Sequence, residues 1–258
     1  MSLPALALLS RPSRLVFIGV GGIGSWLVEP VLRYFSGICN TALFVDGDHV
    51  ENRNLARQSF NPSEVRSSKA ECMRRRMLLM FPGHQLSAHV VFVRAANVML
   101  IVKENDAVFL SPDNHAVRRV VSAHAQKLQN IVVFTAGNEL YDGSCHVYVK
   151  AHGVALTKDF NQRHPEAVDG PAERVGCSEL IDKGAIQLIA VNFMLAAMTM
   201  MAVQHVYSYG AFRTKDEFWS EVPQEVYGDI KALKMRSTLA GKPTKVNQQK
   251  LEEGVCSS

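Results

Sequence analysis

The residues with the clearest chemistry are two cations, Arg57 and Lys69, which follow an acidic segment that begins at Asp46. A triphosphate has a use for both cations, because each phosphate oxygen needs a fixed donor and a positive charge. A hydride-transfer site has little use for them. The pair therefore favours a triphosphate over a nicotinamide as the ligand.

A glycine-rich turn precedes these cations. The apolar run Leu15–Ile18 leads straight into it, and apolar residues then recur at helical spacing from Ser25 to Tyr34. Glycines let a backbone approach phosphate, and the helix N-terminus adds N–H groups, so this is the entrance to a Rossmann-type nucleotide site. Asp46 ends the apolar segment Ala42–Val45 and is placed to bind ribose hydroxyls. The glycines are Gly19, Gly21, Gly22 and Gly24.

Together these pieces resemble the ThiF/MoeB/HesA superfamily, which includes the ubiquitin-activating enzymes. The resemblance is strong from Leu15 to Arg119 and weak from Ala185 to Tyr207. Besides the glycine turn, the matching residues are Asp46, Asp48, Asn54-Leu55-x-Arg57-Gln58, Lys69 and Ser111-Pro112-Asp113-Asn114. Without Arg57, Lys69 and the later motif, the glycine turn alone is equally typical of an ordinary nicotinamide or flavin site.

The resemblance implies that ATP adenylates a carboxylate, the C-terminal glycine of a small ubiquitin-fold or sulfur-carrier protein. Asp113 would hold Mg²⁺ and orient the attacking carboxylate. A ubiquitin-conjugating-type carrier would be a further partner. Gly21, Gly22 and Asp46 would hold the adenosine end, and Asn54, Arg57, Gln58 and Lys69 the phosphates. In-line attack at phosphorus spreads charge over oxygens, so positioning and cationic stabilisation dominate such catalysis.

Asp113 also has a structural interpretation, as the N-cap of a helix expected over Ala116–Leu128. It comes just after a strand expected at Ala107–Leu110. Because ligands of an open α/β sheet bind at the C-terminal ends of the strands, the magnesium role is favoured, and both roles are compatible.

The composition predicts one globular α/β protein. The chain has 258 residues and is 47% hydrophobic, which supports a full core. Its net charge of +4 is too weak to argue for nucleic acid. No secretory signal is evident at the start, and the five scattered cysteines form no C-x-x-C pair. These features argue against a zinc ribbon and a disulfide framework, and they fit a reducing, cytoplasmic setting.

The expected fold is Rossmann-like, with a mostly parallel sheet, an antiparallel extension and helices on both faces. A single domain is expected over 1–230, followed by a polar tail over 231–258. Further strands are predicted at His89–Val93, Ala107–Leu110, Ile131–Thr135 and Cys145–Ala151, and a helix at Ser67–Phe81.

Two later segments need separate interpretation. Thr157–Gly176 has no apolar period and predicts a surface loop. The resemblance implies that this loop crosses the active site and guides the substrate tail. Ala185–Val203 has the length of a membrane helix, but Gln187, Asn192 and Thr199 interrupt it. A buried helix packed on the sheet is favoured, and the resemblance implies that it belongs to a homodimer face.

Cys177 decides whether a thioester follows adenylation. Its position resembles the catalytic cysteine of compact activating enzymes, and the alternative is a small buried residue at a helix entry. Cys256 is a second candidate acceptor. The cysteines expected to be structural are Cys39, Cys72 and Cys145.

The chain departs from relatives that use an N-terminal helix to carry an arginine into the partner's ATP site. Only a short segment precedes the first strand, and Arg11 and Arg14 are the candidates there. Two other functions stay open: adenylation of a carboxylate on a modified tRNA base, and a non-catalytic subunit of a heterodimeric activating enzyme. The intact Arg57, Lys69 and Asp113 argue against the latter.

Overall fold

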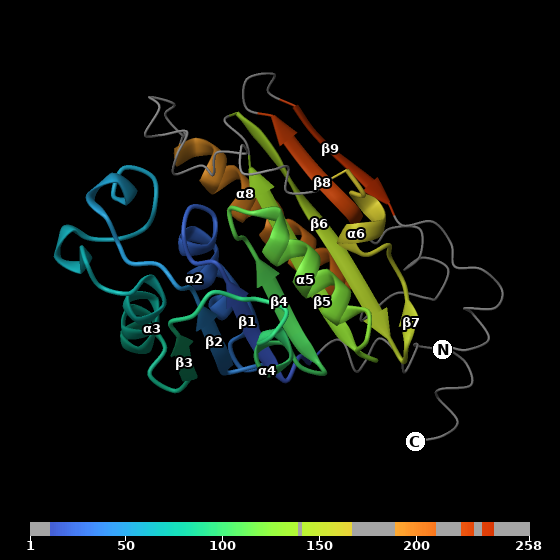
Figure 1. Cartoon of the computed structure of the whole chain (residues 1–258), viewed down its shortest axis with the longest axis horizontal. Helices are drawn as coiled ribbons and strands as arrows, with labels where there is room; N and C mark the ends of the chain where they lie inside the picture. Colours follow the sequence, from blue (N-terminus) through green and yellow to red (C-terminus); the bar gives the residue numbers. More distant parts are fainter. Residues whose placement is uncertain (1–10, 139–140, 167–188, 210–222, 230–233, 240–258) are drawn as a thin grey trace.

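A mixed β-sheet forms the centre of the protein in the computed structural model (Figure 1). The structure describes residues 11–138, 141–166, 189–209, 223–229 and 234–239. Within these residues the sheet has nine strands, in the order β3-β2-β1-β4-β5-β6-β8-β9, with β7 paired to β6.

One half of the sheet is parallel, and β1 lies at its middle. Its strands are β1 (Arg14–Ile18), β2 (Thr41–Val45), β3 (Gln85–His89), β4 (Asp106–Leu110) and β5 (Ile131–Asn138). Val16 of β1 is paired with Leu43 on one side and Val108 on the other. The short apolar runs of β1, β2, β4 and β5 are buried on both faces, as expected for the interior of a parallel sheet.

The other half is antiparallel and starts where β5 pairs with β6. Its strands are β6 (Asp142–Ala151), β7 (Val154–Ala155), β8 (Pro223–Asp229) and β9 (Lys234–Leu239). The predicted change from parallel to antiparallel order is therefore confirmed.

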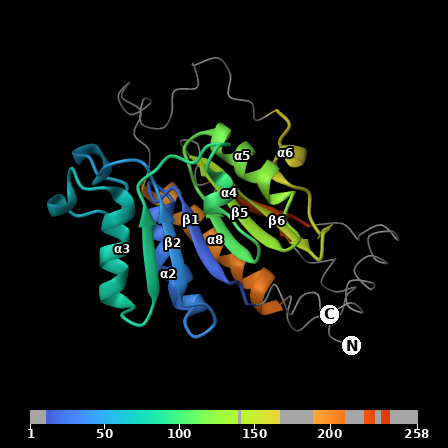
Figure 2. The ribbon, with the colours of Figure 1, turned by 60° about the horizontal axis from the view of Figure 1, so that its bottom comes forward.

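Helices cover both faces of the sheet (Figure 2). Leu15 and Phe17 of β1 pack with α2 and α8, whereas Val16 and Ile18 pack with α4 and α5. This alternation of side chains along β1 builds the two halves of the core. The helices are α2 (Gly24–Phe35), α3 (Lys69–Met80), α4 (Val98–Ile101), α5 (His115–Ala125), α6 (Phe160–Arg163) and α8 (Ile189–Gln204), with 3₁₀ turns η1 (Asn52–Asn54) and η2 (Pro62–Glu64) and a π-helical turn η3 (His205–Tyr209).

Helix α8 is the buried helix expected from the long apolar run. It contacts α2, β5, β6 and β8 and carries no charged residue. In the part of the chain that the structure describes, Ile189–Ser208 is the one stretch long and apolar enough to cross a bilayer, and half of that stretch is buried inside the protein. Packing on α2 and the sheet explains the apolar character of its buried face.

The structure corrects one predicted strand. The strand expected at His89–Val93 is β3, Gln85–His89. Among the described residues β3 is an edge strand whose one neighbour is β2. Its side chains are exposed or half-buried, so it needs no apolar run. The apolar residues that suggested a strand, Val90 to Phe92, are exposed beyond its end.

Two expected irregular segments contain regular structure. The predicted loop 157–176 begins with Thr157, Asp159 and Phe160 buried, and it forms the short helix α6. Its later residues, 167–176, lie outside the described residues. The expected tail 231–258 contains β9, a strand whose polar composition is explained by the exposure of residues 234–238.

Candidate functional site

A pocket opens at the C-terminal ends of β1, β2 and β4, where an open α/β sheet binds its ligands. It brings together most of the residues singled out in the sequence: Gly19, Gly21, Gly22, Asp46, Asp48, Arg57, Gln58, Lys69 and Asp113. Gly24 and Asn54 do not line it. The structure thus brings nine of the predicted residues into one pocket, whereas Gly24 and Asn54 lie outside its lining.

The glycines of the turn have different tasks. Gly19 has a φ of +83°, and a Cβ there would lie 2.8 Å from the carbonyl carbon of Ser111. The Ser111 hydroxyl donates to the Gly19 carbonyl at 2.8 Å. Gly24 begins α2, and a Cβ there would overlap the same Gly19 carbonyl. Gly24 therefore permits close packing of the helix on the turn, while Gly21 and Gly22 face the pocket.

Asp46 holds this turn in place. One carboxylate oxygen accepts a hydrogen bond from the backbone N–H of Val20 at 2.8 Å, and the other accepts from that of Asp48 at 2.9 Å. Burial raises the pKa of Asp46, opposed by the charge of Lys69 and by both N–H donors. The carboxylate keeps lone pairs that could accept from ribose hydroxyls.

Lys69 is a buried cation at the pocket wall. It is the first residue of α3, whose N-cap Ser68 accepts from the N–H of Glu71. The Lys69 ammonium lies 3.1 Å from a carboxylate oxygen of the more exposed Asp48, and the Lys69 N–H donates to the Asp48 carbonyl at 3.0 Å. Asp48 is thus the counter-ion of Lys69, and a phosphate group could compete for the same ammonium.

Arg57 and Gln58 are both buried in the pocket wall. The carbonyl of Asn54 accepts from both of their N–H groups, at 3.0 Å and 2.8 Å. The Asn54 side chain accepts from the N–H of Glu51 at 3.0 Å, closing the η1 turn. Asn54, predicted as a phosphate ligand, therefore lies behind the pocket and shapes the loop that carries Arg57 and Gln58.

Gln58 has a buried side-chain oxygen that a hydrogen-bond donor on a ligand could satisfy. Its side chain is 6% exposed, and its Oε1 has no hydrogen-bond partner within the described part of the protein. The amide lies against Gly21, where a Cβ would come 3.7 Å from its nitrogen. Because a buried, unsatisfied acceptor is costly, a donor group on a bound molecule would stabilise it. A nucleotide offers both such donors and phosphates for the neighbouring cations.

Asp113 is exposed at the rim of the pocket, directly after β4. The N-cap of α5 is Asn114, whose side chain accepts from the N–H of Val117 at 3.0 Å, so the capping interpretation of Asp113 is wrong. Arg118 donates to the Pro112 carbonyl at 2.8 Å and fixes the backbone beside Asp113. Asp113 is therefore available to a ligand in the pocket.

The acidic side chains near the pocket suit a metal that is shared with phosphate. Among the residues whose placement is described, no three His, Cys, Asp or Glu side chains gather around a common point. Mg²⁺ typically takes one or two carboxylates and completes its shell with phosphate oxygens and water. Asp113 fits that role as one carboxylate at the pocket rim.

Two residues that line the pocket, and one buried partner behind it, were not predicted from the sequence. Asn138 at the end of β5 lines the pocket and donates to Asn192 of α8 at 2.9 Å. The 56% exposed ring of Phe92 also lines it and lies against Gly47, where a Cβ would come 2.7 Å from the ring. Such a ring offers a stacking surface for a purine. The interruption of the apolar run by Asn192 was the one available signal.

Several other predicted residues lie away from the pocket. Arg14 forms an ion pair with Asp106 at 2.8 Å at the opposite end of β1, so it is occupied within its own chain. Cys39, Cys72 and Cys145 are unpaired and buried, and burial raises the pKa of Cys145 to about 12. Their burial fits the structural role expected for them. Cys177 and Cys256 lie outside the described residues.

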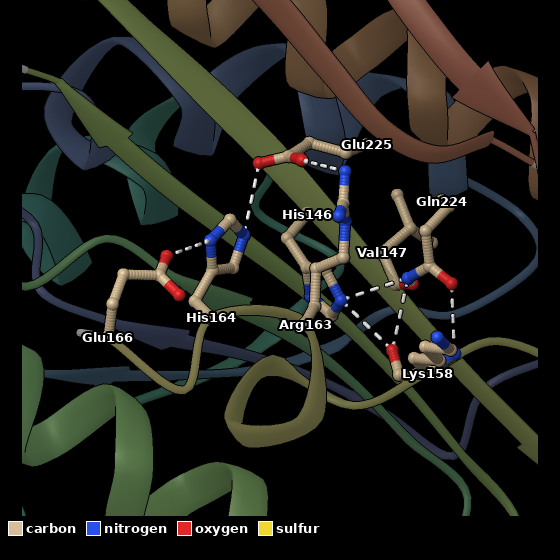
Figure 3. Close-up of polar contacts among 8 residues, drawn as sticks. All are labelled: His146, Val147, Lys158, Arg163, His164, Glu166, Gln224 and Glu225. Atoms are coloured by element: carbon tan, nitrogen blue, oxygen red, sulfur yellow. Dashed lines mark hydrogen bonds and ion pairs between the residues drawn. The ribbon is translucent and has the colours of Figure 1, made fainter.

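A second polar cluster links α6 to the sheet (Figure 3). His164 lies 3.1 Å from Glu225 of β8, and Arg163 lies 3.2 Å from the same carboxylate. The hydrogen bond to Glu225 is the main cause of a raised His164 pKa. Burial opposes ionisation of Glu225, but its bonds and the charges of His164 and Arg163 prevail and lower its pKa to about 2. This cluster fixes the start of the segment expected to cross the site.

His146 is the buried member of this cluster. Its Nε2 lies 2.9 Å from the Lys158 carbonyl, and its Nδ1 has no hydrogen-bond partner among the described residues. The Gln224 amide also bonds the Lys158 backbone through both its nitrogen and its oxygen. Burial, together with the charge of His164, lowers the pKa of His146 to about 4.

The fold and the pocket define a nucleotide-binding α/β protein, and comparison with known proteins specifies the class. The model of the ThiF family matches residues 8–221. The chain therefore belongs to the ThiF family, as the sequence motifs predicted.

Several curated relatives carry names that describe their activities. The adenylyltransferase and sulfurtransferase MOCS3 of Drosophila grimshawi is 30% identical over 140 residues, which is 54% of this chain and 30% of that protein. The adenylyltransferase and sulfurtransferase UBA4 of Yarrowia lipolytica is 27% identical over 139 residues, 54% of this chain and 34% of that protein. This chain thus covers only about a third of the length of these relatives.

Solved structures support the fold. A crystal structure of Escherichia coli MccB with ATP has a TM-score of 0.67 and 20% identity, and the match covers 92% of this chain and 68% of that one. A structure of PaaA has a TM-score of 0.64 and 17% identity, covering 92% and 67%. At these identities the likeness shows the fold.

Gly24→Ala should disrupt the site without involving any ligand-facing side chain. The added methyl would overlap the Gly19 carbonyl and push α2 away from the turn. We expect a loss of about 1–3 kcal/mol in the free energy of unfolding, typical of overpacking, and weaker nucleotide binding. Denaturant unfolding measures the first. Gly83→Ala is the control, because a Cβ at Gly83 meets nothing within 4 Å; equal stability losses in both variants would contradict the packing role.

His146 should make the stability depend on pH. Its pKa in the folded state is about 4, below its ordinary 6.5, so the unfolded chain binds a proton that the folded one excludes between these values. Stability should therefore fall as the pH falls from 6.5 to 4, by up to about 3 kcal/mol. His146→Gln should flatten the dependence measured by thermal and denaturant unfolding. An unchanged slope in that variant would assign the dependence to other groups; His89→Gln, at an exposed position, is the control.

Proposed function

We propose that this chain is an ATP- and Mg²⁺-dependent adenylyltransferase. Its substrate is the C-terminal glycine carboxylate of a small ubiquitin-fold or sulfur-carrier protein. The observation that supports this best is the convergence of two buried cations, Arg57 and Lys69, with the glycine turn and Asp113 on one pocket. Names of the curated relatives, which include adenylyltransferases, support the same activity.

The proposed reaction is an in-line displacement at the α-phosphorus of ATP. A carboxylate oxygen of the substrate attacks that phosphorus, a new P–O bond forms, and the bond to the bridging oxygen breaks. Pyrophosphate leaves with the bonding electron pair, and an acyl adenylate remains. Arg57 and Lys69 carry positive charge where negative charge develops on the phosphate oxygens, and their burial strengthens that interaction.

Three other pocket residues position the reacting groups: Asp46, Gln58 and Asp113. Asp46 fixes the turn that lies beneath the nucleotide. The free side-chain oxygen of Gln58 accepts a hydrogen bond from the nucleotide. Asp113 would hold a magnesium ion, which would supply positive charge to neutralise the phosphates. With the groups held in place, the reaction avoids the entropy cost of bringing them together.

We propose a homodimer as the working form. Helix α8 exposes a stripe of apolar side chains: Ile189, Phe193 and Met201. With the exposed Ala197 between Phe193 and Met201, these residues recur four positions apart, so they share one face of the helix. Light scattering on the purified chain measures the oligomeric state.

The three described cysteines are unpaired, which supports a reducing, cytoplasmic setting.

Nucleotide binding is tested first. MgATP should raise the melting temperature with concentration, because a ligand that binds only the folded state stabilises it by mass action. NADH should leave the melting temperature unchanged, since it carries a diphosphate bridge and lacks the terminal phosphate of the triphosphate that Arg57 and Lys69 are proposed to hold. A shift with NADH and none with MgATP would contradict the proposed chemistry.

Catalysis is tested by ATP–pyrophosphate exchange with a small ubiquitin-fold protein that ends in glycine. Arg57→Ala and Asp113→Ala should each lower exchange by about 10²-fold or more, because each removes charge stabilisation or the metal ligand. Arg75→Ala removes an exposed cation of α3 and should keep activity. Full exchange in a folded Asp113→Ala protein would reject its role. Exchange with a tRNA instead of a protein would identify the other superfamily reaction, and none at all would identify a non-catalytic subunit.

The thioester step depends on Cys177. Adenylation needs no thiol, whereas transfer to a protein carrier needs one that keeps the acyl group activated after AMP leaves. Cys177→Ala should therefore keep exchange and lose a reductant-sensitive adduct on a non-reducing gel. Persistence of the adduct would redirect the assignment to Cys256. Robust exchange without any adduct in the wild type would define an adenylation-only enzyme.

A further inference from the structure

Helix α8 carries two fully buried polar side chains, and they behave differently. Thr199 and Asn192 are both 0% exposed within a helix that has no charged residue. The Thr199 hydroxyl donates to the Leu195 carbonyl at 2.7 Å, so its bond stays inside the helix. Asn192 directs its hydrogen bonds out of the helix, toward the back of the pocket.

Asn192 contacts three walls of the pocket. Its amide nitrogen donates to the Arg57 carbonyl at 3.0 Å, and its amide oxygen accepts from Asn138 at 2.9 Å. A Cβ on Gly22 would lie 3.1 Å from the same oxygen. Since a carbonyl only accepts, the nitrogen of Asn192 must face Arg57, and the orientation of the amide is determined.

The Arg57 carbonyl accepts a second hydrogen bond, from the indole of Trp26 at 3.1 Å. Trp26 belongs to α2 and Asn192 to α8, so the two helices hold one carbonyl between them. The Arg57 N–H in turn donates to the Asn54 carbonyl. The backbone of Arg57 is therefore fixed on both sides, which limits where its guanidinium can lie.

We infer that Asn192 is a positioning residue that holds Arg57 against the phosphates of the bound nucleotide. A buried amide in an apolar helix is costly unless its bonds are made, so its presence needs a reason that packing alone does not supply. The two partners of Asn192 both line the pocket, and they come from distant parts of the chain. The inference rests on the proposed function, because it assigns Arg57 to phosphate.

The test compares Asn192→Leu and Asn192→Ala with the control Thr199→Val from the same helix. Binding of MgATP and of adenosine is measured by calorimetry, and the melting temperature is measured for every variant. Each Asn192 variant should bind MgATP about tenfold more weakly, the scale of one lost hydrogen bond, with adenosine affinity unchanged. Thr199→Val should bind both ligands as the wild type does. The smaller Ala variant provides a second route should Leu fail to fold.

A double-mutant cycle separates positioning from stability. Arg57→Ala removes the guanidinium but keeps the carbonyl that Asn192 binds. In that background, Asn192→Leu should still lower the melting temperature, yet it should no longer change MgATP affinity. An equal loss of MgATP affinity in both backgrounds, or equal losses for adenosine and MgATP, would overturn the positioning role. No MgATP binding by the wild type would overturn the proposed function itself and the inference with it.

Discussion

The candidate site depends on the close approach of three strand ends around the Gly19 peptide. The Gly19 N–H donates to the Val45 carbonyl of β2, while the Gly19 carbonyl accepts from the Ser111 hydroxyl after β4. The Ser111 N–H returns to the Ile18 carbonyl of β1. No side chain at Gly19 would fit, because its Cβ would meet the Ser111 backbone. These hydrogen bonds hold the C-terminal ends of β1, β2 and β4 together at the base of the pocket, so that Arg57, Lys69 and Asp113 can line the same pocket.

The charged side chains that line this pocket determine its electrostatics. Lys69 and Arg57 are buried cations, and burying a charge is costly unless it is paired. Asp48 pairs with Lys69, but its own side chain is about half exposed and so remains accessible. Asp46 is engaged by two backbone donors and holds the turn. The pocket thus carries fixed positive charge on its wall and keeps its rim carboxylates accessible, an arrangement suited to a ligand that brings its own negative charge.

The sequence predicted those parts of the site whose signal is local. The glycine turn is contiguous in sequence, and Arg57 and Lys69 lie in the segment after β2, so each carries a signal that can be read from its neighbours along the chain. Asn192 and Asn138 were missed. Asn192 contacts Arg57 and Asn138, and both contacts join segments that are far apart in sequence. Asn54 was misplaced for a related reason: its polar side chain suggests a ligand, whereas it closes a local turn. The position predicted for β3 was wrong, because an edge strand needs no apolar run.

Helix α8 shows how core and site share the same elements. Its apolar side chains fill the space between α2 and the sheet, and Trp26 of α2 packs on Phe193 in a tilted arrangement with ring centroids 4.1 Å apart. The same two helices then supply the two donors to the Arg57 carbonyl. A shift of α8 along α2 would separate the two side-chain donors, so that they could no longer both reach the Arg57 carbonyl. Packing of the core and placement of the phosphate-facing arginine are therefore one constraint, and the hydrophobic contact between α2 and α8 sets the register in which the polar contacts form.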